Sequence, residues 1–202
     1  MSHKIEENAQ GKTIYVQTDP ELEAMYYTDI REIRDLRELL DGSVDLYADR
    51  PVFWTKKKHG TEYVPITYRM FQKDVEAMGT KMLELGWKGR HIAVTGQSCY
   101  EWFVTYMAIV NGVGVVVPVD KAFDAKAVGN VLKTADCDIL FYTGSEEKKI
   151  DEIPGIQHKI RMDFYGDRID ESEEFIIPET KNDRRHWREL LRDGYDLVRS
   201  GD

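Results

Sequence analysis

The sequence predicts an α/β fold: a parallel sheet built from βαβ units and flanked by helices, with a small β-hairpin near the N-terminus. Two observations predict the sheet. Short apolar runs recur after residue 90, and segments with a helical period of apolar residues separate them. These runs do not alternate between apolar and polar residues, which is typical of parallel strands covered by helices on both faces. Two strand-like runs around a basic turn, before residue 67, predict the hairpin.

Residues 1–29 are predicted to be an N-terminal extension that precedes a domain at residues 30–202. The extension begins with polar residues and has only a short β-like alternation at 12–17. Regular helical spacing of apolar residues starts at Ile30 and continues through Leu40. Gly42 is predicted to end this first helix, as a glycine just beyond the last turn.

The hairpin is predicted from Pro51–Thr55 and Glu62–Ile66, which are joined by the basic turn Lys56–Thr61. Thr67 is a suitable N-cap for the long helix that follows, and Gly86 closes that helix. This helix has the clearest amphipathic pattern of the chain, with apolar residues spaced by three or four at Phe71, Val75, Met78, Met82 and Leu85.

The central part of the chain is predicted to alternate strands with helices. The expected strands are His91–Thr95, Val113–Val119 and Ile139–Tyr142. Helices are expected at Tyr100–Val110 and after a cap at Asp124. This order of elements is the pattern of βαβ units.

The last fifty residues are predicted to be mixed. Strands are expected at Ile160–Tyr165 and Glu174–Ile177, around the acidic loop Asp170–Glu174, and a helix at Asp183–Val198. The apolar stripe of that helix comprises Trp187, Leu190, Leu191 and Val198.

Composition limits the classes of function. The chain has 202 residues, of which 42% are hydrophobic, as in one globular domain or a large piece of one. Its 37 acidic and 28 basic residues give a net charge of −9, which repels nucleic acid and anionic membrane surfaces. No apolar stretch is long enough for a transmembrane helix, and two cysteines do not form a disulfide framework. We therefore expect a cytoplasmic protein with no nucleic-acid partner.

Three turns of the sequence are candidates for a phosphate loop. The turn Gly96–Trp102 follows a predicted strand but has one glycine and no lysine, so we predict a tight turn with Ser98 as helix cap. Gly112 and Gly114 precede a strand rather than follow one, and are predicted to serve packing and turning. In Phe141–Ser145, the glutamates that follow would repel a phosphate, so Ser145 is predicted to be the ordinary N-cap of a short charged helix.

Metal ligands and nucleophiles are not indicated. The histidines, at positions 3, 59, 91, 158 and 186, are scattered, and none has the spacing of a metal site. Cys99 precedes a predicted helix but has no nominated base, so a small buried thiol is the favoured interpretation. The glutamates at 171, 173 and 174 are predicted to form a solvated loop, and Lys56–His59 a charged hairpin tip. The sequence therefore nominates no catalytic, cofactor-binding or metal residue.

A longer pattern does resemble a known family. Its parts are Ile66-Thr67-Tyr68, Leu85-Gly86, Lys88-Gly89-Arg90, Ile92-Ala93-Val94, Ser98, Glu101-Trp102, Ala108, Gly112–Gly114 and Val115 to Asp120, followed by Leu190, Leu191, Gly194 and Ser200-Gly201-Asp202. This resembles the N-terminal part of the adenylate-forming superfamily, over roughly residues 30 to 202. The nearest branch is that of the long-chain fatty acid–CoA ligases. The sequence departs from the family pattern at Gln97, where asparagine is usual, and at Gly89-Arg90-His91, which lacks an acidic residue.

The resemblance implies an enzyme larger than this chain. It implies a carboxylic acid, ATP, Mg²⁺ and CoA as reactants and cofactors of the full-length ligase. The ATP-gripping loop of the family, rich in Ser, Thr and Gly and containing a lysine, would begin beyond Asp202. We therefore expect residues 30–202 to be a subdomain that is inactive alone and has the rest of the parent polypeptide as its partner. No catalytic residue is transferred to this chain.

Other interpretations remain open. The chain is alternatively a free-standing α/β binding or interaction module without catalysis, which would hide its apolar surface within 202 residues. A Rossmann-like nucleotide binder is disfavoured by the missing glycine fingerprint. A shortened enzyme is expected to expose an apolar patch and to self-associate through it. Trp102 and Tyr106 are candidates to approach an acyl pocket, although core packing is the favoured role for both.

Overall fold

The computed structural model describes residues 3–7, 13–17, 33–56, 62–162, 179–181 and 183–201. The chain divides into two compact units, residues 1–34 and 35–202. In the first unit, β1 (His3–Glu7) and β2 (Thr13–Gln17) form an antiparallel pair, with His3 opposite Gln17. Within the β-like alternation predicted at 12–17, residues 13–17 therefore form a strand, with a partner that the sequence did not indicate.

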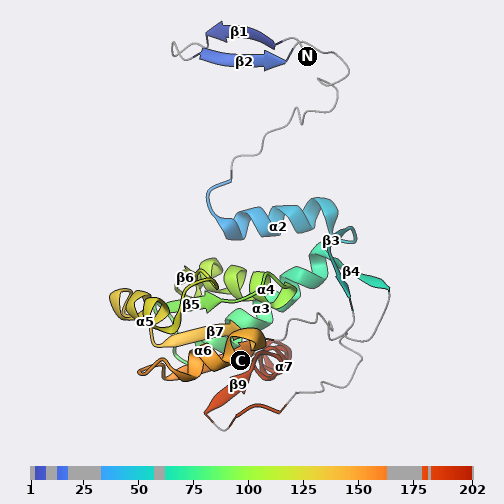
Figure 1. Cartoon of the computed structure of the whole chain (residues 1–202). Coiled ribbons are helices and arrows are strands. Elements are labelled where there is room, and N and C mark those ends of the chain that lie inside the picture. Colours follow the sequence, from blue (N-terminus) through green and yellow to red (C-terminus); the bar gives the residue numbers. More distant parts are fainter. Residues whose placement is uncertain are drawn as a thin grey trace. The chain divides into compact units, whose positions relative to one another are not determined.

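The second unit is built on a five-stranded parallel sheet (Figure 1). Its strands lie in the order β6-β5-β7-β8-β9. The strands are β5 (His91–Thr95), β6 (Val115–Val119), β7 (Ile139–Thr143), β8 (His158–Met162) and β9 (Arg184–His186). The predicted α/β fold with a parallel sheet is confirmed.

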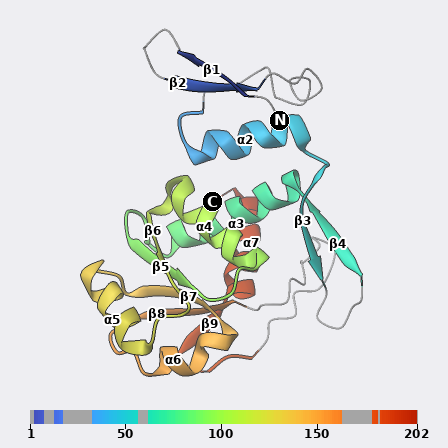
Figure 2. The ribbon, with the colours of Figure 1, turned by 45° about the horizontal axis from the view of Figure 1, so that its top comes forward.

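Alternate residues of the central strands β5 and β7 face two different hydrophobic cores. Ile92, Val94 and Phe141 belong to the larger core, which contains side chains of α3 (Tyr68–Glu84), α4 (Tyr100–Ala108) and α7 (Trp187–Ser200). Ala93 and Leu140 belong to the smaller core under α5 (Ala125–Thr134) and α6 (Glu147–Asp151). Figure 2 shows the sheet between these two groups of helices. Burial on both faces explains why the strands lack an alternating pattern.

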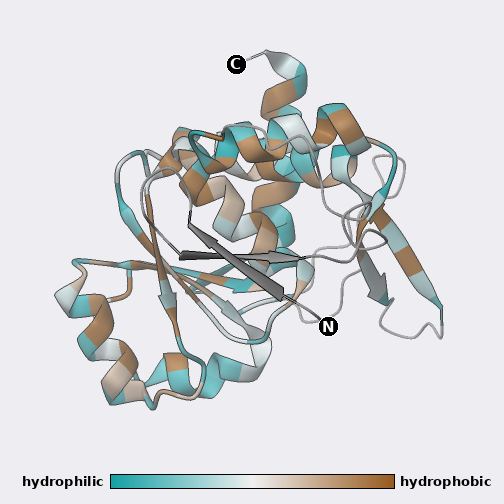
Figure 3. Cartoon of the chain, turned by 90° about the horizontal axis from the view of Figure 1, so that it is seen from above, coloured by the Kyte–Doolittle hydropathy of each residue, from teal (hydrophilic) through white to brown (hydrophobic). Residues whose placement is uncertain are grey.

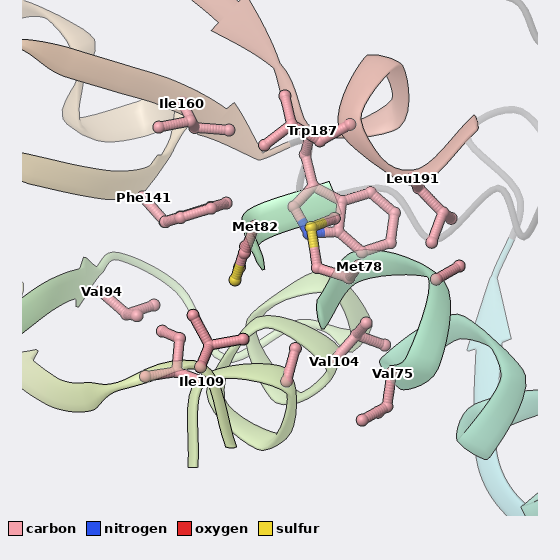
Figure 4. Packing of buried hydrophobic residues seen from close by; sticks show 14 of the residues in the cluster. Val75, Met78, Met82, Val94, Val104, Ile109, Phe141, Ile160, Trp187 and Leu191 are labelled. Carbon is pink, nitrogen blue, oxygen red and sulfur yellow. The ribbon is translucent and has the colours of Figure 1, made fainter. Parts of the chain in front are cut away.

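Helices α3 and α7 pack closely against each other over the larger core. Met78, Met82 and Trp187 meet between them and the sheet (Figure 4). A Cβ atom at Gly194 of α7 would overlap the carbonyl oxygen of Ala77 in α3. Glycine at this position therefore lets the two helix backbones approach. The helices of the unit are amphipathic, with hydrophobic and hydrophilic residues interleaved along their ribbons (Figure 3).

The hairpin and the long helix agree with the prediction. Strands β3 (Pro51–Lys56) and β4 (Tyr63–Thr67) pair antiparallel. The Thr67 hydroxyl accepts a hydrogen bond from the Met70 N–H at 3.3 Å and so caps α3. The predicted basic turn at 57–61 lies outside the described residues.

The first helix was placed too early in the sequence. Helix α2 (Leu36–Tyr47) begins at Asp35, whose carboxylate accepts from the Glu38 N–H at 2.8 Å, and it continues through Gly42. The prediction that Gly42 ends the helix is wrong. Leu40 and Val44 on either side of it are buried in the larger core, and this packing outweighs the helix penalty of glycine, about 1 kcal/mol. Ile33 precedes the helix, and Ile30 lies outside the described residues.

The C-terminal prediction also needs correction. Asp183–His186 is not helical, because residues 184–186 form β9, and α7 begins only at Trp187. The His186 ring caps α7 by accepting from the Arg188 N–H at 3.2 Å. Val198 is 49% exposed, so it is not part of the buried stripe, to which Tyr195 belongs instead. Of the strand predicted at 160–165, the last three residues lie outside the described residues. The same holds for the strand predicted at 174–177 and for the acidic loop at 170–174.

Candidate functional site

The strand order reverses at β5, which is the topological switch point of the sheet: successive connections lead to opposite sides of this strand. From β5, the connection through α4 leads to β6 on one side, and the connection through α5 then leads to β7 on the other side of β5. Helices α4 and α5 belong to the two different cores, so they cover opposite faces. Open α/β sheets bind ligands outside the carboxyl ends of the strands at such a switch point. The carboxyl edge formed by the turns after β5, β6 and β7 is therefore the candidate site.

The turn after β5 is filled by a side chain of β7. Gly96 has a φ of +120°, and a Cβ atom there would overlap the Thr143 hydroxyl. That hydroxyl accepts a hydrogen bond from the Gln97 N–H at 3.1 Å and lies 3.1 Å from the Ser145 hydroxyl. The predicted tight βα turn is confirmed. The backbone amide of Gln97 is occupied by Thr143, so this turn does not form an open phosphate cradle.

Two predicted caps at this edge are wrong. Helix α4 begins after Cys99, and the exposed Ser98 is not its N-cap residue. Ser145 lies inside a short 3₁₀ turn, Gly144–Glu146, and the helix α6 starts after Glu146. In both places the N-cap position lies one residue after the predicted hydroxyl, at Cys99 and at Glu146. The capping rule alone does not decide this.

Cations gather around the turns after β6 and β7. The Lys121 ammonium donates to the Gln97 side-chain oxygen at 3.0 Å. The Lys149 ammonium donates to the carbonyl oxygens of Lys121 and Phe123, at 2.7 and 3.0 Å, and thereby fixes the turn. Arg161 on β8 lies against Gly144, because a Cβ atom at this glycine would fall 2.9 Å from the Arg161 Nε. Lys149 also pairs with Glu146, and Arg161 pairs with Glu147 at 3.5 Å, so these two cations stabilise the edge itself. The exposed Lys121 is the member of the three best placed to meet an anionic ligand.

Sequence reasoning missed a buried ionic cluster behind this edge. The side chain of Arg184, on β9, is 1% exposed. It donates to the Tyr142 hydroxyl and to a Glu147 carboxylate oxygen, both at 2.9 Å, and it forms ion pairs with Asp151 and Asp183. No local signal could have found the cluster, because its members are spread over more than forty residues and Arg184 was assigned to a helix.

The cluster shifts the pKa of its members. A hydrogen bond from Lys181, aided by Arg184, lowers the pKa of the Asp151 carboxyl below its usual range. A hydrogen bond from Lys159, again aided by Arg184, lowers the pKa of Asp183 in the same way. Burial raises the pKa of Tyr142 to about 12 despite the neighbouring guanidinium. All three groups therefore keep their usual charge state at neutral pH, which indicates a structural role.

Cys99 is the N-cap residue of α4, and Trp102 and Tyr106 lie within that helix. Burial, followed by the charge of Glu101, raises the pKa of the Cys99 thiol, so the thiol is not activated. Trp102 stacks on Tyr106 with ring centroids 5.3 Å apart and packs against the larger core. The approach of Trp102 and Tyr106 to an acyl pocket stays a prediction.

A cavity of about 920 Å³ lies away from the switch point, between α5 and the turn at 152–157. Its wall includes Arg90, which pairs with Asp138 at 2.5 Å, and its floor includes Leu132 and Ile153. Cationic and anionic side chains are mixed along its rim. This mixture favours no ligand charge.

Neither a metal site nor a membrane-spanning helix is found among the described residues. Within the residues that the structure describes, no three His, Cys, Asp or Glu side chains lie close enough together to hold a metal ion. None of the helices in the described ranges has the length and apolar character required to span a bilayer. Both cysteines are free thiols.

Comparison with known proteins identifies one family. The family model of the AMP-binding enzymes matches residues 40–193. No curated protein sequence matches the chain. Among solved structures, the anthranilate CoA ligase AuaEII in complex with anthranoyl-AMP is similar, with a TM-score of 0.55 at 14% identity over 66% of this chain.

Two further solved structures share the fold. Acetoacetyl-CoA synthetase from Streptomyces lividans has a TM-score of 0.62 at 16% identity, and a protein assigned as a long-chain-fatty-acid CoA ligase from Rhodopseudomonas palustris CGA009 has 0.57 at 15%. Each matches 78% of this chain. The matched region is 26% of the anthranilate CoA ligase and 25% and 36% of the other two chains, so this chain spans well under half of their length.

Proposed function

The chain belongs to the AMP-binding enzyme family, and from this premise we propose that it is the N-terminal portion of an ATP-dependent, AMP-forming acyl-CoA ligase. The observation that carries the proposal is the family match over residues 40–193. It is supported by three solved structures of the same fold, each named as a CoA ligase or synthetase. The finer assignment to long-chain fatty acids rests on the sequence pattern and belongs to the same proposal.

The proposed reaction has two steps. A carboxylate oxygen of the acid attacks the α-phosphorus of ATP, which forms an acyl-adenylate and releases pyrophosphate. The sulfur of CoA then attacks the acyl carbon, forms the thioester and releases AMP. Both steps require cations and N–H groups that stabilise negative charge on phosphate or carboxylate oxygens. Mg²⁺ would assist the first step, but the described residues offer no metal-binding group, so we assign none of them to it.

Within the proposed enzyme, this chain supplies a scaffold with one wall of the substrate cleft. We place that wall at the carboxyl edge, because the switch point lies there and because Lys121 is exposed beside it. The Arg184 cluster and Lys149 hold this edge in shape. The chemistry itself would depend on groups downstream of Asp202.

Pyrophosphate exchange tests the proposal. The protein encoded by the native gene, translated beyond the codon for Asp202, is expected to exchange pyrophosphate into ATP when supplied with its acid from a panel of short, long and aromatic carboxylic acids. The 202-residue chain is expected to show none. Exchange by the short chain alone would place the chemistry within it. A stop codon after Asp202 would instead favour the binding-module alternative, and calorimetry with ATP or NAD would then test for nucleotide binding.

A lysine variant tests the placement of the cleft in the active full-length enzyme. Lys121→Gln is expected to raise KM for ATP or CoA about tenfold, because it removes a charge-assisted hydrogen bond to a phosphate. Lys133→Gln is the matched control, since Lys133 is an exposed lysine that lines the cavity beyond α5. Equal kinetics for the two variants would show that the carboxyl edge does not contact these substrates.

A further inference from the structure

Strand β6 lies at the edge of the sheet, and its valine-rich sequence is typical of a strand with neighbours on both sides. β6 is the first strand in the sheet order and has only β5 as a neighbour among the described residues. Its sequence is Val-Val-Val-Pro-Val, without a charge, and Val115 is 51% exposed. Valine favours strands strongly, and an uncharged, exposed edge strand invites a second chain to extend the sheet.

The hydrogen bonds show which backbone groups face this edge. The Val115 N–H donates to the Arg90 carbonyl oxygen of the neighbouring segment at 2.9 Å. In a parallel ladder alternate residues bond to the same neighbour, so Val117 and Val119 also direct their N–H and C=O groups toward β5. The backbone groups of Val116 and Pro118 therefore face the open edge.

Three features reduce what that edge offers to another strand. Pro118 has no N–H to donate. The Gly114 N–H is used within the preceding π turn, where it donates to the Ile109 carbonyl oxygen at 3.0 Å. Beyond the strand, the Asp120 carbonyl oxygen accepts from the Phe123 N–H at 3.1 Å. Among the described residues from 114 to 119, Val116 is left as the donor at the edge.

A second copy of this chain is the partner that the open edge would otherwise accept. Antiparallel pairing of two β6 strands about Val117 places Val115 opposite Val119, so valines face valines and each Val116 lies opposite a Pro118. Cross-strand pairs of β-branched residues stabilise a sheet. In this arrangement the missing proline N–H removes about half of the ladder hydrogen bonds.

We propose that Pro118 blocks sheet extension through β6 and so prevents the chain from pairing with a second copy at this edge. The opposite edge is protected differently. Strand β9 has only three residues, Arg184, Arg185 and His186, and a short charged edge strand is a poor template for pairing.

The test replaces the proline in the 202-residue chain. Pro118→Val restores the N–H and the β propensity, and is expected to lower the dissociation constant for self-association about tenfold or more, measured by sedimentation velocity over a wide range of concentrations. Pro118→Lys restores the N–H but adds a charge, and is expected to sediment like the wild type. Pro154→Ala, in an exposed turn outside the sheet, controls for the loss of a proline. Circular dichroism checks that each variant is folded.

Outcomes that overturn the proposal are distinct from those that support it. A folded Pro118→Val chain that sediments like the wild type would overturn it, as would equal association of the valine and lysine variants. Amide hydrogen exchange of the wild type gives a second measurement that needs no variant. The Val116 amide is expected to exchange fast while the amides of Val115 and Val117 are protected. Strong protection of Val116 in dilute wild-type protein would show that the edge is already paired and would also overturn the proposal.

Discussion

The two faces of the sheet are stabilised by different means. The face under α3, α4 and α7 has a large core of long side chains, including Met78, Met82 and Trp187. The face under α5 and α6 has a smaller core of residues such as Ala93 and Val128, with the Arg184 cluster at its end. Stability from apolar burial grows with the area buried. The larger face is therefore expected to determine whether the chain folds, and the smaller face to determine how the carboxyl edge is shaped.

The largest effect is expected on the larger face. Gly194→Val places a side chain where the Ala77 carbonyl oxygen lies, so α3 and α7 must separate, and we expect a loss of about 3 kcal/mol or more in the free energy of unfolding. Gly129→Ala on α5 is the matched control, because its Cβ would make an ordinary contact with Ile153 at 3.6 Å. That change should be neutral or stabilise by about 0.5–1 kcal/mol through helix propensity. Urea unfolding measures both, and equal effects would contradict the difference between the faces.

The second effect concerns the ionic cluster. Arg184→Met removes the buried cation that the carboxylates of Glu147, Asp151 and Asp183 share and leaves the Tyr142 hydroxyl without its partner. Because Asp151 and Asp183 are partly exposed and keep their lysine partners, we expect a cost of about 1–3 kcal/mol. Arg185→Met removes a half-buried neighbour that pairs with Glu189 at 2.9 Å, and should cost about 1 kcal/mol or less. Thermal and urea unfolding of the two variants at neutral pH provide the comparison. A small loss for Arg184→Met would show that the cluster contributes little to the smaller face.

The third effect is a dependence on pH. Because the pKa values of Asp151 and Asp183 are lowered in the folded chain, the unfolded chain binds more protons as the pH falls below about 4. The stability that these carboxylates add is complete at neutral pH and is lost as the pH falls through their folded pKa values. Urea unfolding from neutral to acidic pH should therefore show a steeper decline for the wild type than for Arg184→Met. Parallel curves would show that Arg184 does not hold these pKa values down.

The smallest effect concerns helix caps. Thr67→Ala removes the hydroxyl that accepts from the Met70 N–H and should lower the free energy of unfolding by about 1 kcal/mol. Ser98→Ala changes an exposed hydroxyl that does not occupy the N-cap position of α4. This variant should leave the free energy of unfolding unchanged. Chemical denaturation of the two single variants measures the difference. A similar loss for both would mean that Ser98 stabilises the start of α4 after all.

The candidate site could be predicted only in its local parts. The tight turn at Gly96 followed from one glycine after a strand-like run. The contacts that define the edge were not predictable, because Gln97, Lys121 and Thr143 meet only after the order of the strands is known. Parallel strands join distant segments, so the polar neighbours of a turn are not its neighbours in sequence.

The sequence by itself determined the elements whose signals are local. The spacing from Phe71 to Met82 and the caps at Thr67 and Asp124 specify α3 and the start of α5, because periodicity and capping involve residues a few positions apart. The apolar runs likewise predicted β5, β6 and β7.

Where local signals were weak or contradictory, only the tertiary structure decided which element forms. Helix α2 continues through Gly42 because its flanking residues are buried, and the three polar residues of β9 form a strand because β8 and the partners of Arg184 hold them there. The contact of Gly194 with Ala77 joins residues more than a hundred positions apart. In each case the decisive energy comes from packing and charge pairing between distant segments, which no short stretch of sequence contains.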